Sequence, residues 1–216
     1  MTRKRRSRFD HDVICGLVNE GSSVLDLGCG NGELLIKLIE SKNVHGLGIE
    51  KDIDQVAKTI TKGVPVLHMD LDEGLTGLPD SSFDFVILEK TLQAVKKPLF
   101  VLDEMLRVGG SGIVSFPNFG YRQVVDSLVT TGRMPVTSTL PYQWYDTPNI
   151  HLFTANDFLD WTRANHVTVE HGLFWVDEAI IPFEEGDASE ASEVLFVVKR
   201  FDAHIENLPE GRLEAK

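Results

Sequence analysis

The chain has 216 residues, of which 42% are hydrophobic, and its formal net charge is −12. This composition suits one sizeable α/β domain with a full core and excludes a chain that is disordered throughout. No stretch approaches the ~20 apolar residues of a membrane span, and Cys15 and Cys29 form neither a disulfide framework nor a CxxC motif. We therefore expect a cytoplasmic protein without a membrane-bound part.

The charge is spread unevenly along the chain. Residues 3–8 carry five basic side chains, and no apolar segment typical of a secretion signal follows them. We expect a basic flexible arm over residues 1–12, a single domain over 13–200 and a flexible tail over 201–216. The arm can contact nucleic acid or an acidic partner, but the acidic remainder of the chain makes a phosphate backbone an unfavourable partner.

The first half of the chain alternates short apolar runs with amphipathic stretches. The apolar runs predict strands at 23–28, 44–50, 64–70, 83–89 and 112–118. The amphipathic stretches predict helices at 32–41, 52–62 and 98–107. This order is typical of an α/β fold with a doubly wound, mostly parallel sheet covered by helices on both faces.

The pattern changes after residue 118. Residues 121–132 predict a helix, and an irregular stretch over 134–149 follows, with Tyr142, Trp144 and Tyr145. A connection this long inside a compact domain is usually functional when it is ordered. A helix from Thr154 to about 165 and two strands at 167–177 and 193–200 complete the domain, and the strands predict a C-terminal antiparallel hairpin.

Three glycines at alternate positions follow the first strand in VLDLGCGNG (24–32). Gly28, Gly30 and Gly32 let the backbone turn into a helix and bring bare N–H groups close to a ligand. A dinucleotide fingerprint is GxGxxG, whereas here the spacing is GxGxG and Glu33 follows, whose carboxylate would repel a pyrophosphate. S-adenosylmethionine carries no phosphate and is the favoured ligand.

An acidic residue lies inside the first predicted strand, and acidic residues end the second and third. Glu50 can accept hydrogen bonds from both ribose hydroxyls, and Asp70, with Leu71 beside it, can meet the adenine amino group. Asp26 can orient the turn or reach the ligand's ammonium group. Each residue alone also has an ordinary explanation as a strand end or a helix cap. Together they predict an adenosyl site, with no metal.

At these residues the chain resembles the MetW family of methionine biosynthesis proteins, within the class I S-adenosylmethionine-dependent methyltransferases. The matching segments are VLDLGCGNGELL (24–35), GLGIE (46–50), MDLDEGL (69–75), FDFVILEKTLQAV (83–95), EMLRVG (104–109), SFPNFG (115–120) and GRMPVTSTLPYQWYDTPNIHL (132–152). The last two are the most specific. The resemblance implies a seven-stranded sheet whose last strand is antiparallel, and a role alongside homoserine O-acyltransferase. Glu89 and Lys90 stand where the family has Ser and Gln.

Residues for methyl transfer are less clearly marked. His151 and Tyr145 are the catalytic candidates, since either can act as a general base near the aromatic loop. His151 can equally hold that loop shut by hydrogen bonds. Arg107 and Arg133 can bind a substrate carboxylate or serve as surface charges. Cys29 is expected to be a packed residue, because no basic neighbour lowers its pKa.

Three functions remain open from the sequence. The first is a MetW-like protein that binds S-adenosylmethionine and acts with or regulates homoserine O-acyltransferase. The second is a stand-alone small-molecule methyltransferase. The third is a nucleic-acid methyltransferase that uses the basic arm.

Overall fold

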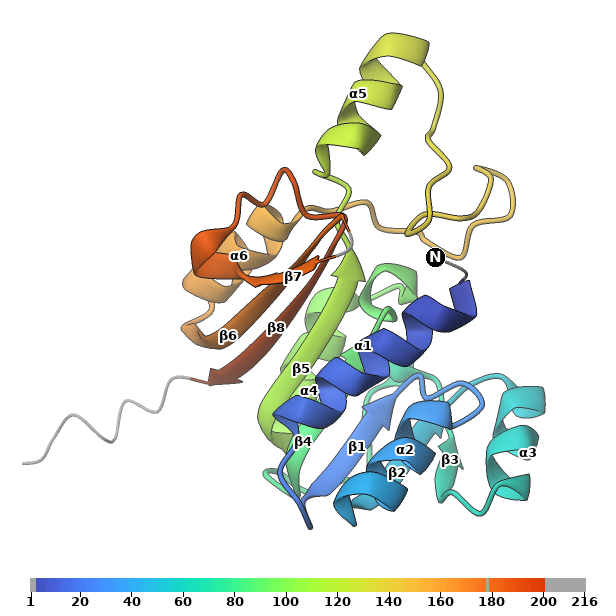
Figure 1. Ribbon diagram of the computed structural model, residues 1–216. Coiled ribbons are helices and arrows are strands. Elements are labelled where there is room, and N and C mark those ends of the chain that lie inside the picture. Colours follow the sequence, from blue (N-terminus) through green and yellow to red (C-terminus); the bar gives the residue numbers. More distant parts are fainter. Residues whose placement is uncertain (1–2, 178, 201–216) are drawn as a thin grey trace, which may run out of the picture.

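A single twisted sheet with helices on both faces forms the frame of the protein (Figure 1). The computed structural model describes residues 3–177 and 179–200. The strands are β1 (Ser23–Leu27), β2 (His45–Glu50), β3 (Val66–His68), β4 (Phe83–Glu89), β5 (Gly109–Pro117), β6 (Val167–Val176), β7 (Ala179–Pro182) and β8 (Glu193–Arg200), in the order β3-β2-β1-β4-β5-β8-β6-β7. Strands β1 to β5 pair in parallel, and β8 pairs antiparallel with β5 and β6. The predicted fold class is thereby confirmed.

The helices follow the predicted alternation. They are α1 (Arg3–Leu17), α2 (Glu33–Lys42), α3 (Ile53–Thr61), α4 (Pro98–Val108), α5 (Arg122–Thr131) and α6 (Ala155–Ala164). One core cluster joins α4 and α6 to the sheet, and a second joins α1 and α2 to it (Figure 1). The predicted start of α6 is confirmed, because Thr154 and Asp157 form a reciprocal capping box.

Two elements were not expected from the sequence. The sheet has eight strands instead of seven, because the chain reverses after Val176 and the short strand β7 pairs with β6. Helix α1 begins at Arg3, so the boundary predicted at residue 12 falls inside a helix. Ile14 and Val18 are almost fully buried and pack α1 into the core. The tail predicted over 201–216 lies outside the described residues.

Helix α5 and the long loop after it stand apart from the sheet (Figure 1). Val124 is the buried residue of α5, and it forms a small cluster with Tyr121 and Leu140. This cluster attaches the loop to α5, and the N–H groups of Ile150 and His151 donate to the Gln93 carbonyl just after β4. The loop predicted over 134–149 is therefore held between α5 and the carboxyl end of β4.

Candidate cofactor-binding site

The strand order reverses between β1 and β4, since β2 and β3 follow β1 on one side and β4 and β5 lie on the other. In open α/β sheets, ligands bind outside the carboxyl ends of the strands at such a switch point. Asp26 and Glu50 lie at the ends of β1 and β2, and Glu89 ends β4. The sheet thus brings together three carboxylates that are far apart in the sequence.

The glycine turn after β1 needs glycine for conformation and for space. Gly28 and Gly32 have φ angles of 79° and 74°, which other residues rarely adopt. A Cβ on Gly28 would lie 2.8 Å from the Thr91 hydroxyl oxygen, and one on Gly32 would lie 2.8 Å from the Thr59 methyl carbon. The turn therefore packs directly against the segment after β4 and against α3.

The expectation of bare backbone N–H groups is wrong for Gly28, Cys29, Gly30 and Gly32. The N–H groups of Gly28 and Cys29 both donate to the Ile49 carbonyl, at 2.8 and 3.0 Å, and the Gly32 N–H donates to the Cys29 carbonyl. The Gly30 N–H donates to Glu50 at 2.9 Å. A pyrophosphate needs free N–H groups, whereas an adenosyl group needs acceptors. This arrangement fits the phosphate-free ligand and disfavours the dinucleotide.

Glu50 links the ends of β1 and β2. One carboxylate oxygen accepts from the Gly30 N–H at 2.9 Å, and the other accepts from the Asp52 N–H at 2.8 Å. The side chain is therefore fixed in place. Because a carboxylate oxygen has two acceptor positions, each oxygen keeps one for a ligand hydroxyl.

Strand β3 ends at His68, two residues before the predicted end, so Asp70 and Leu71 lie just beyond it. Asp70 Oδ1 accepts from the Asp72 N–H at 3.0 Å and caps the 3₁₀-helix Leu71–Glu73. Leu71 is buried and packs in the core. The capping explanation of Asp70 thus holds for one oxygen, and its role toward an adenine stays a prediction.

Asp26 is 3% exposed and lies near several charged groups. Burial raises the pKa of Asp26 to about 8, and the charges of Glu89 and Glu50 add to the increase while His11 opposes it. At neutral pH Asp26 is therefore largely protonated. A cation bound beside it would favour the carboxylate form.

His11 was not anticipated as a site residue. Its Nε2 lies 3.2 Å from the Glu89 carboxylate, and both side chains are mostly buried. Burial alone would lower the pKa of His11, but the hydrogen bond to Glu89 and the charge of Glu89 outweigh it and raise the pKa. Helix α1 thus supplies an imidazole at the end of β4.

Lys90 joins three elements beside this pair. Its ammonium lies 2.5 Å from Asp10 of α1 and 3.0 Å from Glu193 at the start of β8. Asp10 and Glu193 are almost fully buried. The Glu89-Lys90 pair, which departs from the family pattern, therefore fastens α1 to the sheet next to the proposed site.

A cavity of about 260 Å³ lies between the ends of the strands and the loop over 133–150. Its lining is Glu89, Lys90, Gln93, Pro117, Ser138, Thr139, Pro141, Tyr142, Pro148, Asn149 and Glu193. Glu89 belongs both to this cavity and to the charged group around Asp26. The two places are therefore adjacent.

The structure does not bring His151 and Tyr145 together. Within the described part of the chain, neither lines the cavity beside Glu89. His151 borders a separate apolar cavity of about 200 Å³, and its backbone N–H donates to the Gln93 carbonyl at 3.0 Å. Tyr145 is 70% exposed and contacts Trp144 edge to face. Their catalytic role stays a prediction.

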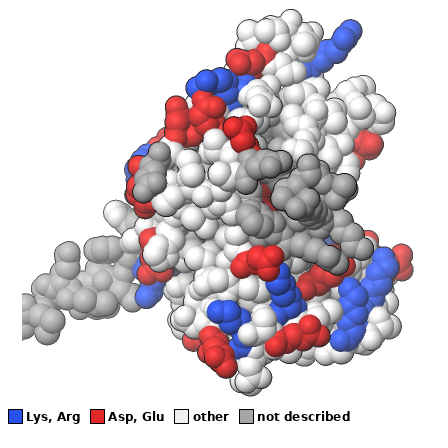
Figure 2. All heavy atoms as spheres, viewed as in Figure 1, with Lys and Arg blue, Asp and Glu red and all other residues white. Residues whose placement is uncertain are grey.

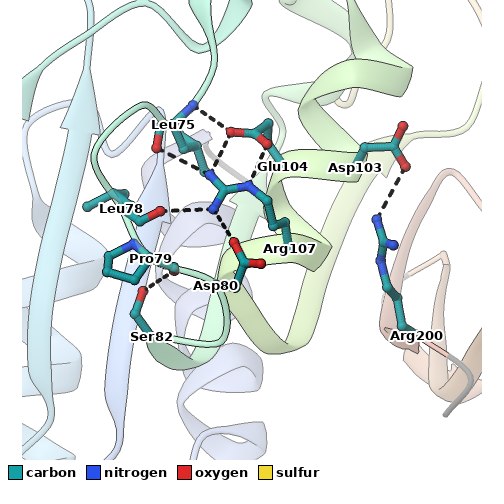
Figure 3. Close-up of polar contacts among 9 residues, drawn as sticks. All are labelled: Leu75, Leu78, Pro79, Asp80, Ser82, Asp103, Glu104, Arg107 and Arg200. Carbon is teal, nitrogen blue, oxygen red and sulfur yellow. Dashed lines mark hydrogen bonds and ion pairs between the residues drawn. The ribbon is translucent and has the colours of Figure 1, made fainter.

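Arg107 serves the scaffold and does not bind substrate. Its guanidinium donates to Glu104, Asp80 and the carbonyls of Leu75 and Leu78 (Figure 3). It lies in the last turn of α4, just before β5 begins, and so lies at the sheet edge opposite to the site. Arg133 is exposed.

Two negative findings hold for residues 3–177 and 179–200. No group of three or more His, Cys, Asp or Glu side chains there can hold a metal ion. No helix in this range has the length and apolar character to cross a membrane.

Comparison with known proteins identifies relatives of this chain by sequence and by structure. The family model described as methionine biosynthesis protein MetW matches residues 8–187. The bifunctional methionine biosynthesis protein MetXA/MetW of Rhodopirellula baltica is 39% identical over 175 residues, 77% of this chain and 28% of that protein. A mitochondrial ubiquinone biosynthesis O-methyltransferase of Saccharomyces cerevisiae is 35% identical over 85 residues, 37% of this chain and 27% of that protein. The chain thus spans less than a third of each relative.

Solved structures share the architecture. An S-adenosylmethionine-dependent methyltransferase from Thermotoga maritima superposes with a TM-score of 0.68 at 16% identity, covering 92% of this chain and 91% of that one. A protein from Pyrococcus horikoshii superposes with a TM-score of 0.66 at 18% identity, covering 91% of both chains. At these identities the likeness shows the fold alone.

Proposed function

Since this chain belongs to the MetW family of methionine biosynthesis proteins, we propose that it binds S-adenosylmethionine and acts with, or regulates, a homoserine O-acyltransferase. The observation that carries the ligand is the fixed Glu50 carboxylate beside the glycine turn, whose two oxygens each keep an acceptor position. Cytoplasmic location is part of this proposal.

The residues at the switch point would divide the ligand among them. Glu50 would accept from the ribose hydroxyls, and Asp70 and Leu71 would meet the adenine. The methionine end would lie toward Asp26, whose raised pKa means that a neighbouring ammonium draws it into the charged form. When bound, S-adenosylmethionine supplies an activated methyl group.

The acyltransferase partner is supported by the relative from Rhodopirellula baltica, whose name joins MetXA and MetW in one protein. We take MetXA to be the homoserine acyltransferase. Trp144 and Tyr145 are 76% and 70% exposed, and such aromatic side chains dominate the binding energy of protein interfaces. The outer side of the loop is therefore a suitable docking face.

Calorimetric titration and co-purification test the two parts separately. S-adenosylmethionine and S-adenosylhomocysteine are titrated into the purified protein, and a homoserine O-acyltransferase from the same source is tested for a stable complex. Tighter binding of S-adenosylmethionine than of its demethylated product favours a sensor. If neither ligand binds, the ligand part of the proposal is wrong, even if the complex forms.

The alternative is a stand-alone small-molecule methyltransferase. The cavity lined by Glu89 favours it, because it adjoins the proposed cofactor site and has room for a small acceptor. This function requires S-adenosylhomocysteine to accumulate when the protein is incubated with S-adenosylmethionine and a metabolite extract. Absence of product from such an extract would count against it.

A further inference from the structure

The cavity between the strand ends and the loop has two contrasting walls. The sheet side presents Glu89, Lys90 and Glu193, and the loop side presents Ser138, Thr139 and Tyr142. At about 260 Å³ it is smaller than the ~300–1,000 Å³ pockets that hold drug-sized ligands. It therefore suits a small metabolite.

The charged side chains on the sheet side carry a net negative charge. The carboxylates of Asp10, Glu89 and Glu193 face one ammonium, that of Lys90, and one imidazole, that of His11. The carboxylates outnumber these cations whether His11 is protonated or neutral. Among the described side chains at this end of the sheet, the balance favours a cationic ligand.

Gln93 gives the cavity a second requirement. It is 5% exposed and lines the cavity, and its Nε2 donates to the Lys90 carbonyl at 2.7 Å. This bond identifies the amide nitrogen and therefore also the amide oxygen. The remaining atom, Oε1, is buried and has no hydrogen-bond partner within the described residues. A buried acceptor without a donor costs free energy. A ligand N–H or O–H would satisfy it once the Gln93 side chain turns Oε1 toward the cavity, because the atom is not exposed there in this structure.

We propose that this cavity binds a small metabolite with a primary ammonium group, an amino acid or amino alcohol, through Glu89 and the Gln93 amide. The ammonium supplies a positive charge that offsets the excess of carboxylates, and N–H donors for Glu89. The hydroxyl-bearing loop side would receive the polar end of the molecule. This inference rests on the proposed function, because it places a second ligand beside the proposed S-adenosylmethionine site.

Proton–nitrogen correlation NMR tests this directly, because it detects weak binding and locates it. The probes are L-homoserine and propanolamine, which share the ammonium and the hydroxyl. N-acetyl-L-homoserine, which lacks the ammonium, is the matched control. We expect saturable shifts of the Gln93 side-chain amide and of residues 138–149 with both amines, and affinity at least about tenfold weaker for the acetylated compound, or about 1.4 kcal/mol.

Two variants keep the inference falsifiable. Gln93→Met is expected to weaken amine binding while S-adenosylhomocysteine still binds. Gln123→Met, at an exposed position of α5, is expected to change neither. If neither amine gives saturable shifts, or if the acetylated control binds as well, the inference is overturned. If S-adenosylhomocysteine does not bind to the wild-type protein, the proposed function is refuted instead.

Discussion

The carboxylate of Glu50 accepts a hydrogen bond of 2.9 Å from the backbone N–H of Gly30. This bond ties the end of β2 to the glycine turn after β1, across twenty residues of sequence. It leaves acceptor positions on a side chain that can no longer move freely. Preorganisation of this kind lowers the entropy cost of binding a ribose diol.

Replacement of Glu50 by alanine is therefore expected to abolish most ligand binding. We expect the affinity for S-adenosylmethionine to fall by at least about tenfold, because charge-assisted hydrogen bonds contribute roughly 1.5–3 kcal/mol. Calorimetric titration measures the loss. Glu40→Ala, on the exposed face of α2, is the control and should bind as the wild type does. Equal affinities for the two variants would remove Glu50 from the site.

Asp26 makes the stability of the protein depend on pH. Its ordinary pKa is 3.8, and burial followed by the charge of Glu89 raises it to about 8 in the folded protein. Between pH 3.8 and about pH 8, the Asp26 carboxyl has lost its proton in the unfolded chain and retains it in the folded chain. The contribution of Asp26 to stability is therefore full below the lower pKa and is lost as pH rises through the upper one.

An Asp26→Asn variant removes this dependence. Between about pH 5 and 7, the free energy of unfolding of the wild type should fall relative to that of the variant by about 2–3 kcal/mol, at 1.36 kcal/mol for each pKa unit. Urea unfolding at several pH values measures the difference. Asp146→Asn, at an exposed loop position, is the control. A constant difference across this range would show that Asp26 ionises normally.

Arg107 is expected to affect stability and not binding. Arg107→Met removes donors to Glu104, Asp80 and the Leu78 carbonyl, whereas the Leu75 carbonyl keeps the bond from the Leu78 N–H. A loss of about 2–4 kcal/mol follows from breaking several charge-assisted bonds. Arg163→Met, which breaks an exposed pair with Asp160, should cost less than about 1 kcal/mol. Chemical denaturation distinguishes the two, and a weakened affinity for S-adenosylmethionine in Arg107→Met would contradict the assignment.

Cys29 should resist alkylation although it lies in the glycine turn. Burial, followed by the charges of Asp26 and Glu50, raises the pKa of the thiol to about 12. Because only the thiolate reacts, the folded protein should take up little iodoacetamide at this position near neutral pH, whereas the unfolded protein should react fully. Peptide mass spectrometry separates Cys29 from Cys15. Rapid labelling of Cys29 in the folded protein would mean that the turn opens.

The strands β1 to β5 and their helices could be predicted because their signals are local. Apolar runs, Pro98 at a helix start and the Thr154–Asp157 capping pair all act within a few residues. The glycine spacing likewise predicted the turn after β1, in which Gly28, Gly30 and Gly32 have positive φ angles. Its adjacency to Glu50 followed from the parallel order of the strands.

The contacts around α1 could not be predicted in this way. Lys90 and Asp10 are eighty positions apart, and nothing near either residue indicates the other. The basic run at residues 3–8 pointed to a flexible arm over 1–12, whereas Asp10 and His11 are buried beside partners on distant segments. Tertiary packing decides such a segment, and local propensity does not.

The outer side of the loop over 133–150 is the last part to test. Trp144 and Tyr145 pack edge to face at 5.5 Å and are mostly exposed, and the surrounding face carries few charged side chains (Figure 2). An exposed apolar surface of this kind marks an interaction site.

The paired substitution Trp144→Ala and Tyr145→Ala should weaken the complex with the acyltransferase by at least about tenfold, because a central aromatic contributes 2 kcal/mol or more. Calorimetry with S-adenosylhomocysteine should give the wild-type affinity, since neither residue belongs to the proposed cofactor site around Glu50. A matched control, Ile53→Ala with Ile60→Ala on exposed α3, should leave the complex intact. If both pairs weaken it equally, the docking face lies elsewhere.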